Sequence, residues 1–265
     1  MKSGNLIFLI FGVLIGCTKD TLDHLVPGNL TLNFKHLVKG NPAMYNQMIY
    51  KNAAGNTYEL TNIQWFISDV AFLDTSGNVI PTSAKNWIHY VDTDLPETQS
   101  WTIEDIKPGD YKGIIFVFGM KGEKNIPNMF SNPPESNMFW PDMMGGDFGG
   151  YHYMKLNGFW LDPAGERTPF NCHLGVGQIY DANDSITGYV QNWFEVFLPN
   201  SSFKIAGNET INADLNMNIE SWFETPFNFD FNVYGGTIMM NQEAMGKIRD
   251  NGNDVFTITY KQVGS

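Results

Sequence analysis

The segment "NLTLNFKH", residues 29–36, alternates apolar and polar side chains and decides the fold class of this chain. Successive side chains of a β-strand point to opposite faces, so the apolar positions of this segment share one face. That face consists of Leu30, Leu32, Phe34 and His36. The same period of two returns in "INADLNMNIE", residues 211–220, and in "PFNFDFNVY", residues 226–234. We therefore predict half-buried strands at all three places.

Two further signals complete the prediction of the fold. The segment "KPGDYKGIIFVFG", residues 107–119, begins with a Pro-Gly turn and continues as a strand that is apolar on both faces, which is typical of a central strand. Clusters of Gly, Asn and Asp, which are typical of hairpin loops, stand in residues 52–60, 73–80 and 181–190. We predict a mainly β fold, a single antiparallel β-sandwich with long loops and one or two short helices.

Helices are expected in two short segments. In "MMNQEAMGKIRDNG", residues 239–252, apolar side chains at Met240, Ala244 and Ile248 recur at helical intervals. The Asn-Gly pair at the end of that segment predicts a C-terminal helix cap. A second short helical turn is expected in "TIEDI", residues 102–106.

The chain begins with an apolar run that is too short to span a bilayer and that ends in a lipobox, "LIGC", at Cys17. We interpret residues 1–16 as a lipoprotein signal peptide, residues 17–28 as a tether lipidated at Cys17, and residues 29–265 as the β-sandwich domain. The protein is then expected in the cell envelope, anchored by lipid to a membrane, on the periplasmic or the outer side. Mass spectrometry tests this expectation, which an unmodified Cys17 contradicts.

Charge and motif content exclude several classes of function. The net charge of −12 makes nucleic acid an unfavourable partner. With Cys17 lipidated, Cys172 remains the single free thiol, so no intramolecular disulfide is expected. The sequence contains no Gly-x-Ser-x-Gly elbow, phosphate loop, Cys-x-x-Cys or His-Glu-x-x-His motif. Cys172 and His173 are neighbours whose side chains point to opposite faces of a strand, which suits no nucleophile–base pair. We therefore expect no enzymatic activity.

The stretch "FWPDMMGGDFGGYHYMKLNGFW", residues 139–160, concentrates aromatic rings, methionines and glycines. Two consecutive glycines divide it into a bent loop and a strand that is predicted at residues 151–156. His152 lies between two tyrosines and is interpreted as part of an aromatic cluster. One hypothesis is an exposed aromatic platform that binds carbohydrate or a protein partner without a metal. That platform would consist of Trp140, Tyr151 and Trp160.

The histidines support a different hypothesis, a metal site. Imidazole ligands suit copper among the first-row metals. His173 is followed by two glycines in "HLGVG", which let a backbone or a ligand approach closely. His36 and His89 also have packing interpretations, His36 as a hydrogen-bonded core residue and His89 as the neighbour of Trp87 on one strand face. The residues alone leave both interpretations open.

Six segments, taken in order, give the chain its resemblance to a known family. They are "LNFKHLVKG", "YELTNIQWFISDVAFLDTSG", "WIHYVDTD", "IKPGDYKGIIFVFG", "NMFWPDMMGGDFGGYHYMKLNGFW" and "FNCHLG". Over residues 30–177 their order and spacing resemble the MbnP-like family of copper-associated proteins. The resemblance implies an exported β-rich protein that binds a copper ion and is found beside a di-haem peroxidase-type partner. In relatives that partner oxidises a tryptophan to kynurenine.

The resemblance also implies which residues form the site. It places His36 and His173 as the main copper ligands, with His89 as a third candidate. Trp140 matches the oxidised tryptophan, and Trp87 is the alternative position. The implied function is copper acquisition or storage, and the aromatic platform without metal remains the alternative.

Overall fold

The computed structural model describes residues 26–140, 149–183, 185–239 and 241–261. The predicted signal peptide, Cys17 and nearly all of the predicted tether lie outside these residues. Strands dominate the described part of the chain, which confirms the predicted mainly β, sandwich-like fold. No helix in this part is both long and apolar enough to cross a membrane.

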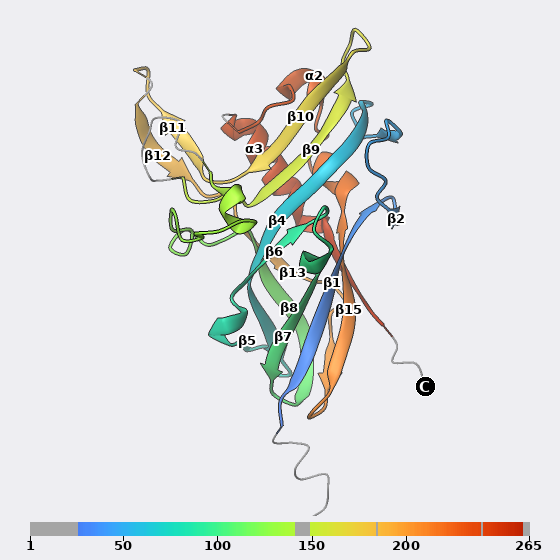
Figure 1. Ribbon diagram of the computed structural model, residues 1–265, viewed down its shortest axis with the longest axis vertical. Helices are drawn as coiled ribbons and strands as arrows, with labels where there is room; N and C mark the ends of the chain where they lie inside the picture. Colours follow the sequence, from blue (N-terminus) through green and yellow to red (C-terminus); the bar gives the residue numbers. More distant parts are fainter. Residues whose placement is uncertain (1–25, 141–148, 184, 240, 262–265) are drawn as a thin grey trace, which may run out of the picture.

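Strands form two large sheets and one small one (Figure 1). The five-stranded sheet consists of β1 (Gly28–Val38), β2 (Asn41–Pro42), β7 (Ser100–Ile106), β15 (Thr210–Asn218) and β16 (Phe256–Tyr260). The nine-stranded sheet consists of β3 (Tyr50–Lys51), β4 (Thr57–Asp74), β5 (Val79–Pro81), β6 (Ile88–Asp92), β8 (Gly109–Phe118), β9 (Met154–Leu161), β10 (Arg167–Leu174), β13 (Phe194–Phe197) and β14 (Phe203–Ile205). The small sheet is the projecting hairpin of β11 (Gly177–Tyr180) and β12 (Ile186–Val190).

Helical segments are short and lie between the strands. In the described part of the chain the α-helices are α2 (Phe231–Tyr234) and α3 (Gln242–Asn251). The single turns of 3-10 helix are η1 (Ala84–Asn86), η2 (Pro96–Thr98), η3 (Glu135–Met138), η4 (Ile219–Phe223) and η5 (Gly252–Asp254). The predicted helix is confirmed by α3, which starts where the Asn241 side chain accepts the Ala244 amide and ends before Gly252. Met240 lies outside the described residues.

The opening segment forms strand β1 with the predicted apolar face. Its residues alternate between buried and half-buried positions, and Leu30, Leu32 and Phe34 are buried. Strand β15 also alternates as predicted, and its residues pair with those of β1. This pairing is parallel, with Phe34 opposite Leu215, so the predicted antiparallel arrangement is wrong for this pair of strands. The two strands are far apart in the chain, which leaves ample length for the connection that parallel strands need.

Aromatic rings from both large sheets meet between them and form the core. Trp65 of β4 lies 5.5 Å from Phe34 of β1 and 5.4 Å from Phe256 of β16, measured between ring centroids. Phe116 of β8 lies 5.2 Å from the Phe256 ring. Because β8 pairs with β4 on one edge and with β13 and β14 on the other, its predicted central position is confirmed. The three predicted hairpin loops join β3 to β4, β4 to β5, and β11 to β12.

Two predictions of local structure are wrong. Residues 102–106 belong to strand β7 and pair with β1, so tertiary pairing overrides the expected helical turn. Residues 226–234 contain helix α2 where a strand was expected. The Asp230 side chain accepts the amide of Asn232 and begins that helix, because an acidic side chain at this position stabilises free amides of a first helical turn.

The α2 segment predicts two very different effects of truncation. Phe231 is 1% exposed and packs 4.7 Å from the Phe170 ring, whereas Val233 is 71% exposed. We expect Phe231→Ala to lower the free energy of unfolding by about 3–5 kcal/mol through loss of burial and a residual cavity. Val233→Ala should change it by less than about 0.5 kcal/mol. Urea denaturation measures both, and a comparable loss in the two variants would contradict the helical assignment.

Candidate metal centre

Two short segments run side by side and build one wall of the candidate site. The Trp140 amide donates to the Gly150 carbonyl at 2.8 Å, and the His152 amide donates to the Met138 carbonyl at 2.7 Å. Tyr151 forms an isolated antiparallel bridge with Phe139. The strand predicted to begin at residue 151 therefore begins later, at Met154, because the preceding residues pair with this segment and continue β9 only from there.

Glycines at three positions allow the Trp140 ring and its backbone to pack this closely. A Cβ atom on Gly149 would lie 2.0 Å from the Trp140 carbonyl oxygen, and one on Gly175 would lie 2.3 Å from the Trp140 ring. Gly150 adopts a φ of +64°, a conformation that disfavours other residues. Of the two glycines after His173, Gly175 is approached by the Trp140 indole, which is 2% exposed, and Gly177 by the Gln242 side chain.

His152 occupies the centre of this wall. Its Nδ1–H donates to the Met138 carbonyl at 2.9 Å, which leaves the lone pair on Nε2. That Nε2 atom is buried and has no hydrogen-bond partner among the described residues. The ring lies 4.6 Å from the Trp140 ring and 5.0 Å from the His173 ring, measured between centroids.

His173 lies on strand β10, and its two ring nitrogens have the opposite roles to those of His152. Its Nε2–H donates to Asn157 Oδ1 at 2.8 Å, so the lone pair is on Nδ1. The amide of Asn157 is oriented in turn, because its Nδ2 donates to Asn62 Oδ1 at 2.9 Å. The Nδ1 atom of His173 is buried and unpartnered within the described structure. Two adjacent imidazoles thus each have one anchored nitrogen and one nitrogen without a partner.

Both imidazoles are neutral at physiological pH. Burial lowers the pKa of His173 from 6.5 to about 4, and the positive charge of Lys155 lowers it further. Burial also lowers the pKa of His152 well below its ordinary value, with contributions from His173 and Lys155. A neutral imidazole is the form that binds a metal ion. A histidine that binds a metal through one ring nitrogen usually donates a hydrogen bond from the other nitrogen to an oxygen atom.

His36 is placed in a different environment. Its Nε2 accepts a hydrogen bond from the indole Nε1–H of Trp65 at 3.1 Å. In the neutral ring the proton is then on Nδ1, so neither nitrogen offers a free lone pair. Burial lowers the pKa of His36 to about 4. In the structure, His36 is therefore a hydrogen-bonded core histidine, which is the packing interpretation of the sequence.

His89 and Trp87 are not neighbours in the way the sequence indicated. The His89 ring stacks between Phe34 at 5.4 Å and Trp101 at 5.2 Å, and its Nε2–H donates to the Thr98 carbonyl. Trp87 precedes strand β6, which begins at Ile88, and no contact between the Trp87 and His89 rings is found in the described residues. The side chain of Trp87 instead lines a separate cavity.

The structure brings together only part of the predicted site. Trp140 and His173 gather around His152, but His36 and His89 do not join them. Across the described residues no three side chains of His, Cys, Asp or Glu form a group that could hold a metal ion. Cys172 points into the core, and burial raises the pKa of its thiol. Among the described residues, His152 and His173 are the two imidazoles that lie together at this centre.

The alternative of an exposed aromatic platform is not supported at the predicted residues. Trp140, Tyr151 and Trp160 are 2%, 1% and 5% exposed, so none presents its ring face to solvent. His152 was not predicted as a site residue, because its position between two tyrosines indicated an aromatic cluster. The glycines at positions 149, 150 and 175 were the available signal, since they mark where two backbones and a ring approach one another.

The protein is a sandwich-like β protein in which the His152 ring lies between the rings of Trp140 and His173. The chain belongs to the MbnP family, whose family model matches residues 27–241, and this confirms the resemblance in its motifs. Among solved structures, MbnP from Methylosinus trichosporium matches 88% of this chain and 98% of its own, at 12% sequence identity and a TM-score of 0.54. At that identity the likeness concerns the fold alone. Comparison with curated proteins gives no match.

The low pKa of His36 predicts a pH-dependent stability. The pKa is about 4 in the folded state and 6.5 in an exposed imidazole, so the unfolded chain binds more protons between these values. Stability is therefore lost as the pH falls through this window, by about 2 kcal/mol between roughly pH 7.5 and pH 5. In His36→Gln, whose amide oxygen can still accept from Trp65, this part of the loss should disappear. Urea denaturation at both pH values measures the difference, and equal losses in the two proteins would contradict the assignment.

Proposed function

We propose that this protein binds one copper ion through His152 and His173 and serves copper acquisition or storage in the cell envelope. The observation that carries the proposal is the pair of buried, unpartnered ring nitrogens, Nε2 of His152 and Nδ1 of His173. A buried polar atom without a partner costs free energy, and a metal ion would satisfy both atoms at once.

The chemistry of the donors fits copper. Both imidazoles are neutral, and the Met138 carbonyl and the Asn157 amide hold their protonated nitrogens. Imidazole binds copper well among the first-row divalent ions, and the absence of a third ligand among the described His, Cys, Asp and Glu residues fits a site of few donors. The family resemblance supplies the choice of copper over other metals that imidazole accepts.

The chain's own residues orient and shield this centre. Asn62 and Asn157 form a relay of amides that fixes the His173 tautomer, and the Met138 carbonyl does the same for His152. Trp140 covers the His152 ring and excludes water from it. A copper ion bound here would supply one-electron redox chemistry next to the indole. We extend the proposal to oxidation of Trp140 by a di-haem peroxidase-type partner, with Trp87 as the alternative position.

The proposal also covers where the protein is located and whether it binds an ion or catalyses a reaction. The lipobox at Cys17 would anchor the protein to a membrane of the cell envelope, on the periplasmic or the outer side. Trp140 packs closely on Gly149 and Gly175 and shields the His152 ring from solvent, which favours holding an ion over turning over a substrate. The protein therefore acts as a binding protein and not as an enzyme.

Copper titration of purified variants tests the ligand assignment. We expect one copper ion per chain, with affinity reduced more than about 100-fold in His152→Gln and in His173→Gln because each removes half of the donor set. His36→Gln and His89→Gln are matched controls that replace histidines outside the pair and should retain the site. Competition against a chelator of known affinity measures each constant.

Two outcomes would reject this assignment. Wild-type affinity in His152→Gln or His173→Gln would place the copper elsewhere. Loss of binding in both His36→Gln and His173→Gln, with binding retained in His152→Gln, would support the ligand set that the resemblance implied. The variant Asn157→Leu tests whether Asn157 orients the His173 ring without binding the copper ion itself. It should weaken binding by about 10- to 100-fold without changing the stoichiometry, since the residue acts on His173 through a hydrogen bond.

A further inference from the structure

A cavity of about 480 Å³ lies away from the histidine pair, on the outer side of strand β4. Its walls come from β4, from the segment around β5 and η1, and from the segment that follows β8. The residues that matter for its chemistry are Asp69, Trp87, Glu123, Lys124, Ile126 and Met129. A volume of this size is typical of sites for small organic ligands.

A β-bulge places Asp69 in the wall of this cavity. The register between β4 and β8 shifts between Ser68 and Ala71, and Asp69 has a φ of +50°. Hydrogen bonds hold this irregular backbone, from the Asp69 amide to the Trp87 carbonyl at 2.7 Å and from Ser68 Oγ to the Gly119 carbonyl at 2.7 Å. Bulges and left-handed backbone at residues other than glycine concentrate at functional sites, where they direct a side chain.

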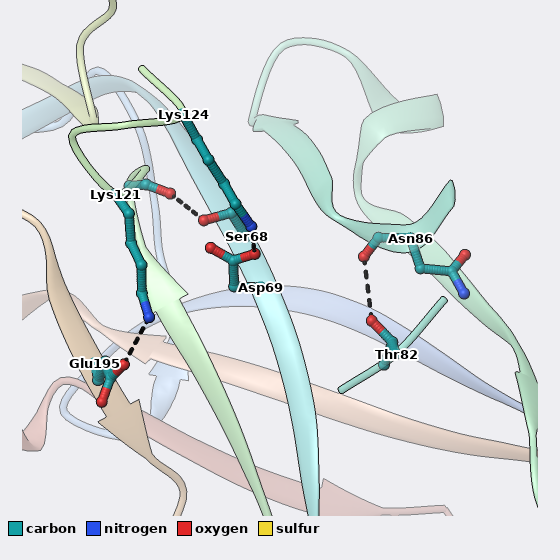
Figure 2. Close-up of polar contacts among 8 residues, drawn as sticks. Ser68, Asp69, Thr82, Asn86, Lys121, Lys124 and Glu195 are labelled. Carbon is teal, nitrogen blue, oxygen red and sulfur yellow. Dashed lines mark hydrogen bonds and ion pairs between the residues drawn. The ribbon is translucent and has the colours of Figure 1, made fainter. Parts of the chain in front are cut away.

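The bulge directs a carboxylate that is only partly neutralised. One oxygen of Asp69 forms an ion pair with Lys124, as Figure 2 shows, and the other is buried without a hydrogen-bond partner in the described structure. Glu123 also lines the cavity and takes part in none of the ion pairs among the described residues. Lys121 does not line the cavity; it forms an ion pair with Glu195 and interacts more weakly with Asp69 and Glu123. The lining therefore carries two carboxylates against one ammonium group.

The ammonium group of Lys124 occupies a position suited to a cation. It contacts Asp69 and lies 5.8 Å from the centroid of the Trp87 ring, within the range of a cation–π interaction. A carboxylate together with an indole face is a common way to bind ammonium ligands. The Lys124 side chain is 41% exposed, so it can turn outward into water at small cost. Ile126, which is 56% exposed, and Met129 add apolar surface beside this position.

We propose that this cavity binds an organic cation, a primary ammonium group on an apolar body, and that the ligand's ammonium replaces that of Lys124 between Asp69 and Trp87. The apolar body packs against Ile126 and Met129, and Glu123 adds attraction for the positive charge. The proposal is independent of copper, because it uses none of the residues of the histidine pair.

Binding of 2-phenylethylamine to the purified chain tests the proposal, with a chelator present so that the amine cannot act through copper. Isothermal titration calorimetry should give a dissociation constant of about 1 mM or below, as suits a ligand of this size. Two isosteric probes isolate the charge, neutral 2-phenylethanol and anionic 3-phenylpropanoate. Both should bind at least about tenfold more weakly, because the lining has an excess of negative charge.

Three variants then locate the site. Glu123→Gln should weaken the amine about threefold by removing an exposed charge, and Trp87→Leu should weaken it about fivefold or more. Lys124→Met should tighten it by about fivefold, because the competing ammonium is gone and both Asp69 and Trp87 become available. Lys247→Met is the matched control, since Lys247 also combines an ion pair with a cation–π contact, to Glu243 and Phe227, at a distant helix.

The proposal depends on whether Lys124→Met tightens or weakens the binding of the amine. Weaker binding of the amine in that variant, or equal binding of the three probes to the wild-type chain, would overturn the proposal. So would an absence of binding at concentrations of several millimolar. Glu123 lies on a surface segment, so its variant keeps the test valid even where replacement of Trp87 impairs folding.

Discussion

Strand β4 runs through the centre of the molecule, and the backbone polar groups along this buried strand need partners. Eighteen residues, Thr57–Asp74, pair with β3, β5, β6, β8 and β9. Both sites depend on this pairing. Asn62, at the register shift between β4 and β9, orients Asn157 and through it His173. At the other end the shift between β4 and β8 directs Asp69 into the outer cavity. Two register shifts along strand β4 therefore position side chains of two separate sites, the histidine pair and the outer cavity.

The hydrogen-bond partner of each histidine decides what that histidine can do. An indole N–H donates to His36 and occupies its lone pair, whereas oxygen acceptors bind the protonated nitrogens of His152 and His173 and leave their lone pairs free. His36 and His152 are buried and His173 is half-buried, and the pKa of each ring is lowered, so charge state alone does not distinguish them. Among these three rings, the direction of one hydrogen bond separates His36 from the two potential ligands.

Close packing around Trp140 links the aromatic stretch to this centre. The ring rests against Gly175 and its carbonyl against Gly149, at distances that a Cβ atom would prohibit. Trp140, Tyr151, Tyr153 and Trp160 of this stretch are buried, so these rings do not form a surface for recognition. Trp87, the other tryptophan that the resemblance singled out, lies beside a charged cavity with Lys124 over its ring. The two indoles thus belong to chemically different environments.

Local sequence determined those features that depend on periodicity, turn chemistry and motif order. The alternation in β1 and β15, the cap of α3, the hairpin loops and membership of the MbnP family all follow from residues that are near neighbours in the chain or from the order of its segments. Alternation failed at residues 226–234, where Asp230 caps a helix.

Tertiary structure alone decided which histidines meet and which nitrogens are free. His152 and His173 are brought together by β9, β10 and the segment that carries Trp140, and their partners Met138 and Asn157 lie 14 and 16 residues away along the chain. No local period encodes contacts at such separations. They arise only when distant backbones pair, and the direction of the resulting hydrogen bonds then determines the chemistry.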